Sequence, residues 1–352
     1  MAAKPNLLLD PYWRRIDELF APQSLGGLHE LCNVVWAKDR PMPPSLFQDA
    51  LPYAEILVTT APLLTPEVLD HAKRLRMVIE VEGAFPDTID YAACAKRGIE
   101  VLCCAPGFRQ SVAEMGLAMA LAGARGLVEE HTAMRQGGEH WLDDQPDRDF
   151  TMFGAQVGFV GYGQIAQELT RLLAPFRAQV LAYDPWLPQA VAQQNGAQLM
   201  GLDGVLEKAK CLFVTAVPTA ENHNLLDEAK LSLMPKGALL VLLSRAHLVD
   251  FHALSNALKA GRIHAALDVF PTEPVAADDD IRNLPGTILS PHRAAAVTGG
   301  RHLIGDMILD DIKSWISGNP KRRLTSASDS KIKLLAGVGD ARSTQDLAAS
   351  RS

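Results

Sequence analysis

The sequence predicts an α/β protein of two domains, each built around a parallel β-sheet. Short apolar, β-rich runs alternate with helix-like segments along most of the chain, a pattern typical of parallel sheets. The chain has 352 residues, and a domain commonly contains about 100–200. A composition of 48% hydrophobic and 21% charged residues fits an ordinary globular protein.

The first part of the chain predicts one capped helix and three strands. The helix is expected over residues 65–75, because Thr65 fits an N-cap and Pro66 fits the first helical position. Three apolar runs predict the strands, at residues 54–59, 77–81 and 99–102.

The middle of the chain combines a long apolar helix, a loop and a second α/β region. Residues 112–124 are apolar or small almost without interruption, which predicts a helix buried on nearly all sides. The polar stretch 135–150 predicts a long loop. Beyond Pro320 the chain is polar and then rich in Ala, Gly and Ser, so we expect a loosely packed tail, with an arm that wraps a partner as the alternative. Six strands are expected between loop and tail, at residues 156–160, 179–183, 211–215, 238–243, 265–269 and 287–289.

Composition excludes several classes of protein. The formal charge is -7, from 34 Lys and Arg against 41 Asp and Glu, so nucleic acid is not expected as a partner. Five cysteines without a C-x-x-C spacing argue against a disulfide scaffold and a zinc site, and no metal is expected. Cys103 and Cys104 are interpreted as small buried hydrophobic residues rather than a redox pair. The leucine run near the N-terminus is too short for a signal-peptide core, and no run is long enough to span a bilayer. We expect a soluble, cytoplasmic protein without membrane partners.

A glycine turn between an expected strand and an expected helix indicates a dinucleotide site. Residues 161–166 read G-x-G-x-x-A. Gly161 would permit the tight turn, Gly163 would let the backbone approach a pyrophosphate, and Ala166 would keep helix and strand close. Asp184 directly follows the next expected strand, where a carboxylate can accept hydrogen bonds from a ribose and favours NAD over NADP. Six strands that begin at such a turn are the number expected of a doubly wound nucleotide domain.

Three further polar residues lie at or just beyond the ends of expected strands. They are Arg245 in LSRAHLVD, Glu273 in ALDVFPTEP and His292 in LSPH. In a doubly wound sheet the carboxyl ends of the strands line the cofactor crevice, so these three side chains are candidates for chemistry.

With these motifs the chain resembles the D-isomer-specific 2-hydroxyacid dehydrogenases, which include phosphoglycerate, glyoxylate and hydroxypyruvate enzymes. The resemblance runs from about Glu82 to Pro320 and also covers DTID at 87–90, SVAE at 111–114, VPTAE at 217–221 and LMPKGA at 233–238. It implies a flavodoxin-like substrate domain, residues 1–109 and 297–352, into which an NAD-binding Rossmann domain, residues 110–296, is inserted. It also implies an NAD-dependent oxidoreductase that interconverts a 2-oxoacid and a D-2-hydroxyacid.

The resemblance assigns roles that the chemistry of each residue supports. Arg245 would hold the substrate's carboxylate and carbonyl oxygen, since a guanidinium fork matches two oxygens. His292 would act as general acid and base, and Glu273 would bind its other ring nitrogen. The backbone near Ala84 and Phe85 would reach the substrate's carboxylate. The residues expected to bind NAD are Gly161, Gly163, Gln164, Ile165, Asp184, Thr215, Val217, Pro218, Ser244 and Asp268.

The chain departs from the family pattern at several positions. Phe85 replaces the second glycine of the family's Gly-x-Gly-x-Asp loop, Pro86 removes one donor, and Arg293 follows the catalytic histidine where a small or aliphatic residue is usual. Our hypothesis is that Phe85 and Arg293 reshape the pocket, although Arg293 could equally point to solvent. Ala246 replaces a usual glycine, which matters only if its φ is positive. We expect no regulatory module after Pro320.

Other functions of the same fold stay open. An NAD(H)-sensing, corepressor-like binding protein is the alternative, and Glu273 counts against a formate enzyme, which carries Gln there. The resemblance also implies a homodimer, with the helix 112–124 and the loop 137–141 as the contact region. The substrate and the direction of flux are not determined by the sequence.

Overall fold

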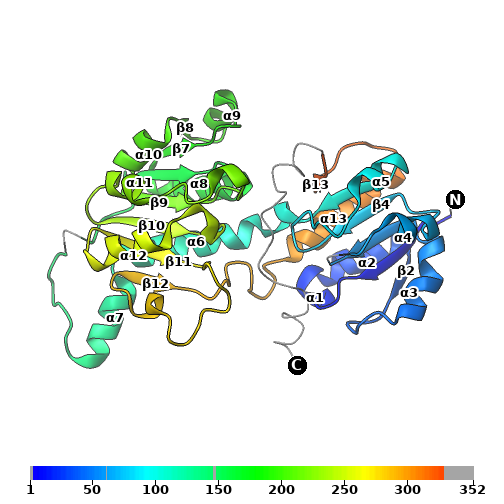
Figure 1. Ribbon diagram of the computed structural model, residues 1–352, viewed down its shortest axis with the longest axis horizontal. Helices are drawn as coiled ribbons and strands as arrows, with labels where there is room; N and C mark the ends of the chain where they lie inside the picture. The colour runs from blue at the N-terminus through cyan, green and yellow to red at the C-terminus, as the bar shows by residue number, and fades with distance from the viewer. Residues whose placement is uncertain (1–2, 61, 146–147, 329–352) are drawn as a thin grey trace. The chain divides into compact units, whose positions relative to one another are not determined.

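The computed structural model describes residues 3–60, 62–145 and 148–328. By its internal contacts the chain divides into two compact units (Figure 1). The first comprises the residues up to Phe108 and those from Ala296 onward, and the second is Arg109–Ala295. Each unit contains one sheet of mainly parallel strands with helices on its faces, so the predicted α/β fold is confirmed.

The first unit is a sheet in the order β13-β5-β4-β3-β1-β2, in which only β13 is antiparallel. Alternate residues of its strands enter two cores, as a period of two requires. Leu7 and Leu9 pack on one face among side chains of α2 and α13, whereas Leu8 packs on the other with Leu69 of α4. The strands are β1 (Asn6–Asp10), β2 (Asn33–Trp36), β3 (Ile56–Thr59), β4 (Met77–Glu80), β5 (Glu100–Cys103) and β13 (Thr325–Ser326). The helices are α1 (Ile16–Leu19), α2 (Pro22–Leu31), α3 (Pro44–Ala50), α4 (Pro66–His71), α5 (Tyr91–Lys96) and α13 (His302–Ile316).

The second unit is a parallel sheet in the order β12-β11-β10-β9-β6-β7-β8. Its first strand, β6, lies between β7 and β9, so the strand order reverses at β6, where nucleotides bind in such sheets. Helices α10, α11 and α12 cover one face, and α6 and α8 pack together against the other. The strands are β6 (Gln156–Val160), β7 (Gln179–Tyr183), β8 (Gln198–Leu199), β9 (Cys211–Val214), β10 (Ala238–Leu242), β11 (Ile263–Leu267) and β12 (Thr287–Leu289). The helices are α6 (Arg109–Ala124), α7 (Leu127–Gln136), α8 (Gln164–Leu173), α9 (Gln189–Gln194), α10 (Leu202–Lys208), α11 (Glu228–Leu233) and α12 (Phe251–Lys259).

The structure corrects several expected elements. Strands β1, β2, β8 and β13 were not expected; β1 contains the leucine run considered above only as a leader. The strand expected at 265–269 is Ile263–Leu267. The helix expected over 65–75 ends at His71, although Thr65 caps it as predicted by accepting a hydrogen bond from Val68 N–H at 3.4 Å.

Helix α6 is not buried on nearly all sides, because Glu114 and Ala118 are exposed. Its buried face depends on glycine. A Cβ on Gly116 would lie 2.6 Å from Leu243 Cδ1, and one on Gly123 would lie 2.7 Å from Leu239 Cδ2. Small residues in this helix therefore permit close packing on the sheet rather than complete burial.

The prediction of a loosely packed tail beyond Pro320 is wrong for residues 321–328. Leu324 is buried, and the buried carboxylate of Asp311 accepts hydrogen bonds from Arg323 N–H at 2.7 Å and Leu324 N–H at 2.9 Å. Arg322 pairs with Glu100, and β13 then joins the edge of the sheet. Residues 329–352 lie outside the described part of the chain.

Two other expectations can be compared with the structure. Cys103 and Cys104 are buried, as predicted, and no disulfide links them. Among the described residues, no single helix is long and apolar enough to cross a membrane; the segments Ala105–Ala124 and Leu127–Gln136 meet that criterion only as a pair bent by 55°.

Candidate active site

The glycine turn after β6 has the geometry that a dinucleotide site needs. Gly161 has a φ of +84°, and a Cβ there would lie 2.3 Å from the Cα of Ala216, so only glycine fits. Thr215 Oγ donates to Gly161 O at 2.7 Å and holds the turn. Gly163 is the N-cap residue of α8, and a Cβ on it would meet nothing within 4 Å. The packing of the chain therefore does not require glycine at 163, whereas a pyrophosphate at the helix start would use that space and the amides of Gln164 and Ile165.

Asp184 is fixed beside this turn at the end of β7. Its Oδ2 accepts a hydrogen bond from Tyr162 N–H at 2.9 Å, and its Oδ1 accepts one from Trp186 N–H at 3.0 Å. The carboxylate is partly exposed, and each oxygen keeps a second lone pair. It can therefore still accept hydrogen bonds from ribose hydroxyls.

The loop after β9 carries Val217 and Pro218 and is held by two side chains that sequence reasoning missed. Asn222 Oδ1 accepts from Thr219 N–H at 2.8 Å, and Asn222 Nδ2 donates to Val217 O at 2.9 Å. His247 Nε2 lies 2.8 Å from Thr219 O, so it donates there and connects the loop to the turn that follows Arg245. The Thr-x-x-Asn spacing resembles a capping box and could have indicated Asn222, whereas nothing local indicates His247.

The structure brings His292 and Glu273 into contact. His292 Nδ1 lies 2.7 Å from Glu273 Oε2, and Glu273 Oε1 accepts a hydrogen bond from Phe270 N–H at 3.0 Å. The His292 side chain is 32% exposed and that of Glu273 is 14% exposed. Because Nδ1 faces a carboxylate it carries the proton, and no other described residue bonds Nε2.

Asp268 holds the loop that carries His292. It is buried, with 1% of its surface exposed, and its carboxylate accepts hydrogen bonds from Ser290 Oγ, from Arg293 N–H at 2.8 Å and from Ala294 N–H at 3.0 Å. Its carbonyl oxygen accepts from His292 N–H at 2.8 Å, and the φ of His292 is +52°. The family resemblance implied that Asp268 binds NAD, which stays a prediction; the structure adds that Asp268 holds this loop.

Arg245 follows β10, at the same sheet edge as the His292 loop after β12. It precedes the short helical turn Ala246–Leu248, and Nη1 donates to Ser244 O at 2.9 Å. Ala246 is not among the described residues with positive φ, so alanine causes no strain there. Ser244 Oγ is buried and has no protein partner in the described part of the chain, which fits a site completed by a bound group.

The substrate loop, defined here as residues 82–87 of the first unit, is anchored to the end of β4. Gly83 has a φ of +82°. Ala84 N–H donates to Glu80 Oε2 at 2.8 Å, so this amide faces the protein's own carboxylate. The Phe85 ring lies edge-on to Tyr91, with centroids 6.2 Å apart. The substrate-binding roles of Ala84 and Phe85 stay predictions.

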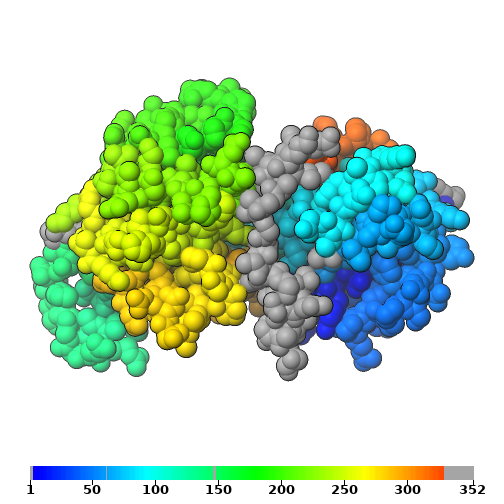
Figure 2. All heavy atoms as spheres, viewed as in Figure 1, coloured from blue at the N-terminus to red at the C-terminus, as the bar shows by residue number. Residues whose placement is uncertain are grey.

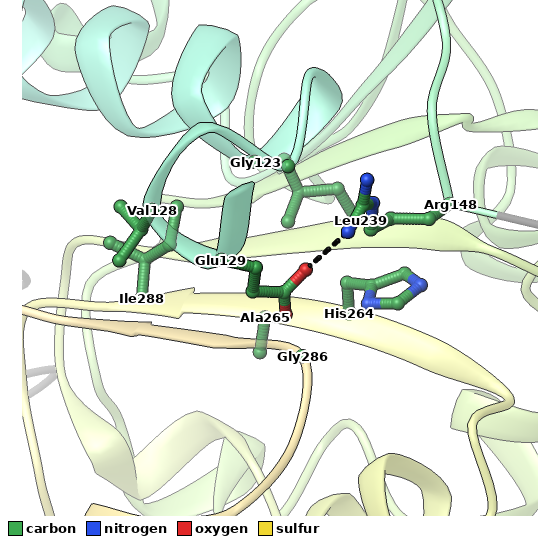
Figure 3. A pocket seen from close by; sticks show the side chains of 10 residues that line it. Gly123, Val128, Glu129, Arg148, Leu239, His264, Ala265, Gly286 and Ile288 are labelled. Atoms are coloured by element: carbon green, nitrogen blue, oxygen red, sulfur yellow. Dashed lines mark hydrogen bonds and ion pairs between the residues drawn. The ribbon is translucent and has the colours of Figure 1, made fainter. Parts of the chain in front are cut away.

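A small pocket in the second unit is separate from these residues (Figure 3). It is lined by Leu239 near the start of β10, by His264 and Ala265 of β11, and by Arg148, whose guanidinium donates to Glu129 at 2.9 Å. These positions lie toward the amino ends of the strands, whereas His292 follows a carboxyl end. Its volume of about 10 Å³ holds about one water molecule, which is too small for a 2-oxoacid.

A doubly wound sheet with a glycine turn at its reversal point defines a dinucleotide-binding protein. Residues 117–294 match the NAD binding domain of the D-isomer specific 2-hydroxyacid dehydrogenases, and the chain belongs to this family. NAD(H), the predicted cofactor, is the cofactor that this domain is named for.

Known relatives support the assignment. The chain is 32% identical over 305 residues to the D-3-phosphoglycerate dehydrogenase of Mycobacterium tuberculosis, covering 86% of this chain and 56% of that protein. It is 27% identical to the glyoxylate reductase of Pyrococcus horikoshii, covering 85% of this chain and 91% of that one. A solved phosphoglycerate oxidoreductase from Rhizobium etli superposes with a TM-score of 0.82 at 34% identity, over 92% of this chain and 99% of that chain. The chain thus spans little more than half the length of the phosphoglycerate dehydrogenases that it matches.

Proposed function

We propose that this protein is an NAD-dependent dehydrogenase that interconverts a 2-oxoacid and a D-2-hydroxyacid. The observation that carries the proposal is the 2.7 Å contact between His292 and Glu273, at the sheet edge that also bears Arg245. A histidine oriented by a carboxylate is suited to transfer a proton, and an arginine at the same sheet edge is suited to hold a carboxylate.

In the proposed reaction, the cofactor and three side chains have separate roles. When bound, the nicotinamide cofactor supplies or accepts the hydride. His292 donates a proton from Nε2 to the substrate's carbonyl oxygen in reduction and takes it back in oxidation. Glu273 keeps the proton on Nδ1 and stabilises the charged ring. Arg245 binds the substrate's carboxylate and polarises the carbonyl oxygen.

The cofactor is held by residues of the second unit. The amides at Gly163, Gln164 and Ile165 bind the pyrophosphate, and Asp184 accepts hydrogen bonds from the ribose and repels a 2′-phosphate. The other residues that we assign to the cofactor are Gly161, Thr215, Val217, Pro218, Ser244 and Asp268.

The substrate is a 2-oxoacid with a side chain that fits beside the Phe85 ring. The relatives named for phosphoglycerate and glyoxylate indicate the range of the family. Phe85 and Arg293 are the two residues that we expect to change specificity; the side chain of Arg293 is exposed, and its backbone N–H donates to Asp268.

NADH oxidation tests the proposal with a panel of glyoxylate, hydroxypyruvate, pyruvate, 3-phosphohydroxypyruvate and bulkier 2-oxoacids. Turnover with one of them, and a changed order of preference in Phe85→Gly, is the expected result. Tight NADH binding without turnover of any 2-oxoacid would refute the proposed dehydrogenase activity and would support an NAD(H)-sensing protein. Identical substrate preferences in wild type and Phe85→Gly would show that Phe85 does not determine substrate specificity.

We also propose that the protein forms a homodimer through α6, α7 and the loop that follows. Helix α7 lies beside β12 and forms a projecting surface at the lower left of Figure 2. Its exposed apolar side chains include Leu127 at 61% and Trp141 at 73%, and such patches mark association surfaces. Light scattering should give a dimer for wild type and a monomer for Leu127→Glu; a monomeric wild type would refute the proposal. A cytoplasmic location stays a prediction.

A further inference from the structure

Glu80 is a buried carboxylate that the proposed reaction does not use. It ends β4, and only 1% of its surface is exposed. Its Oε1 accepts a hydrogen bond from Glu82 N–H at 2.7 Å, and its Oε2 accepts one from Ala84 N–H at 2.8 Å. The protein's own carboxylate thus occupies the amides of the substrate loop, which would otherwise be suited to an anion.

No cation neutralises this group among the described residues. Thr59 of β3 and Cys103 of β5 are its partners in the sheet, and Tyr91 of α5 lies close enough to sense its charge. Glu82 is a like charge beside it.

The nearby Arg14 does not offset the charge of Glu80, because its guanidinium already pairs with Glu82. Arg14 donates to both oxygens of Glu82 at 2.7 Å. Burial and Glu82 raise the pKa of Glu80 to about 8, although the loop amides favour its ionised form.

These contacts occupy part of the loop's amides. Glu82 and Ala84 donate to Glu80, the Gly83 amide also lowers the pKa of Glu80, and Pro86 has no N–H. The amides of Phe85 and Asp87 make no hydrogen bond with the described residues. The Phe85 amide is one residue from an amide that Glu80 binds, so it is the donor through which we expect the loop to meet a substrate carboxylate.

We propose that Glu80 is a positioning residue of the substrate loop, which anchors the loop amides to the sheet and admits a substrate carboxylate at Phe85 only in its neutral form. Two carboxylates close together at a site of low dielectric cannot both be ionised at low cost. Substrate binding is therefore coupled to a proton on Glu80. This inference rests on the proposed function, because it takes the ligand of the loop to be the carboxylate of a 2-oxoacid.

Kinetic measurements test the coupling. KM and kcat for the most active 2-oxoacid of the panel are measured at saturating NADH from pH 6 to pH 9.5. Wild-type KM should be constant near pH 6 and rise about tenfold per pH unit above about pH 8. Glu80→Gln cannot ionise, so its KM should lack this rise. A purely structural role would change KM equally at all pH values.

Two further variants serve as matched controls. Glu82→Gln removes the like charge, so the rise in KM should begin at a lower pH than in wild type. Glu67→Gln changes an exposed carboxylate on α4 of the same unit and should reproduce the wild-type profile. A wild-type KM that is independent of pH, or a rise in Glu80→Gln parallel to that of wild type, would overturn the coupling.

Hydrogen exchange tests the anchoring separately from the reaction. In Glu80→Ala the amides of Glu82 and Ala84 should exchange at least about tenfold faster than in wild type, since their acceptor is removed. Unchanged exchange would overturn the anchoring role. Absence of turnover with every 2-oxoacid would refute the proposed function and the coupling with it, whereas the exchange result decides the anchoring by itself.

Discussion

Replacing Glu80 with glutamine should make the stability of the first unit less sensitive to pH. The pKa of Glu80 is about 8 in the folded protein and has an ordinary value of 4.5. The folded state thus binds this proton more tightly than the unfolded chain. The stability that the proton on Glu80 contributes is fully present below about pH 4.5 and is lost as the pH rises toward 8.

The size of the effect follows from the interval between the two pKa values. Each pH unit within it costs the folded state about 1.4 kcal/mol, so ionisation of Glu80 costs about 4 kcal/mol between pH 5 and pH 8. Glutamine has no such cost. Its single acceptor oxygen keeps only one of the two amide bonds, which makes the variant less stable than wild type by about 1 kcal/mol at pH 5. The order of stability should therefore reverse before pH 8.

Urea unfolding at pH 5, 6.5 and 8 measures this reversal. Tryptophan fluorescence reports on the first unit through Trp13, Trp36 and Trp315, and the exposed variant Glu67→Gln controls for the loss of a carboxylate. The free-energy difference between Glu80→Gln and wild type should shift by about 4 kcal/mol in favour of the variant from pH 5 to pH 8. A difference that does not change with pH would refute the reasoning.

Four other substitutions test the second unit. His292→Ala should lower kcat by about 10²–10⁴-fold while NADH affinity, measured by fluorescence, is retained; an unchanged kcat would exclude it as the general acid. Arg245→Ala should raise KM and lower kcat, because Arg245 binds ground and transition states, and an unchanged KM would remove it from substrate binding. Asp268→Asn should reduce the free energy of unfolding by about 2–3 kcal/mol, since a buried amide NH₂ would replace one acceptor oxygen; equal urea midpoints would contradict this. Gly161→Ala should lower the free energy of unfolding by at least about 2 kcal/mol and weaken NADH binding, because the Cβ of the new alanine would overlap Ala216. A variant as stable as wild type would show that the turn can adapt.

Local patterns were sufficient for much of the second unit. All six strands expected there exist, although the one at β11 begins two residues earlier than predicted. These strands are continuous apolar runs because both faces of a parallel sheet are buried. The glycine turn was also recognisable, since the φ of Gly161 is a local requirement that only glycine meets.

The first unit was harder to predict because its edge elements have weak local signals. Strand β2 has no fully buried residue, and β13 is two residues long and gains its place by pairing with β5. The segment before β13 is polar in sequence but ordered by Asp311, which lies in a helix some twelve residues earlier and accepts its amides. Polarity alone could not distinguish such an anchored segment from a loose tail.

Residue patterns alone were enough to predict the fold class, the dinucleotide turn and Arg245, Glu273 and His292 as candidates for chemistry. Which polar groups contact one another became clear from the three-dimensional fold. In the fold, His292 contacts Glu273, and the carboxylate of Asp268 accepts hydrogen bonds from the loop that carries His292. The amide of Ala84 donates to Glu80. The physical reason is that a pattern of residues fixes backbone conformation over a few positions. The partner and charge state of a buried carboxylate depend instead on which segments the completed sheet brings to its edge, and on how much water they exclude.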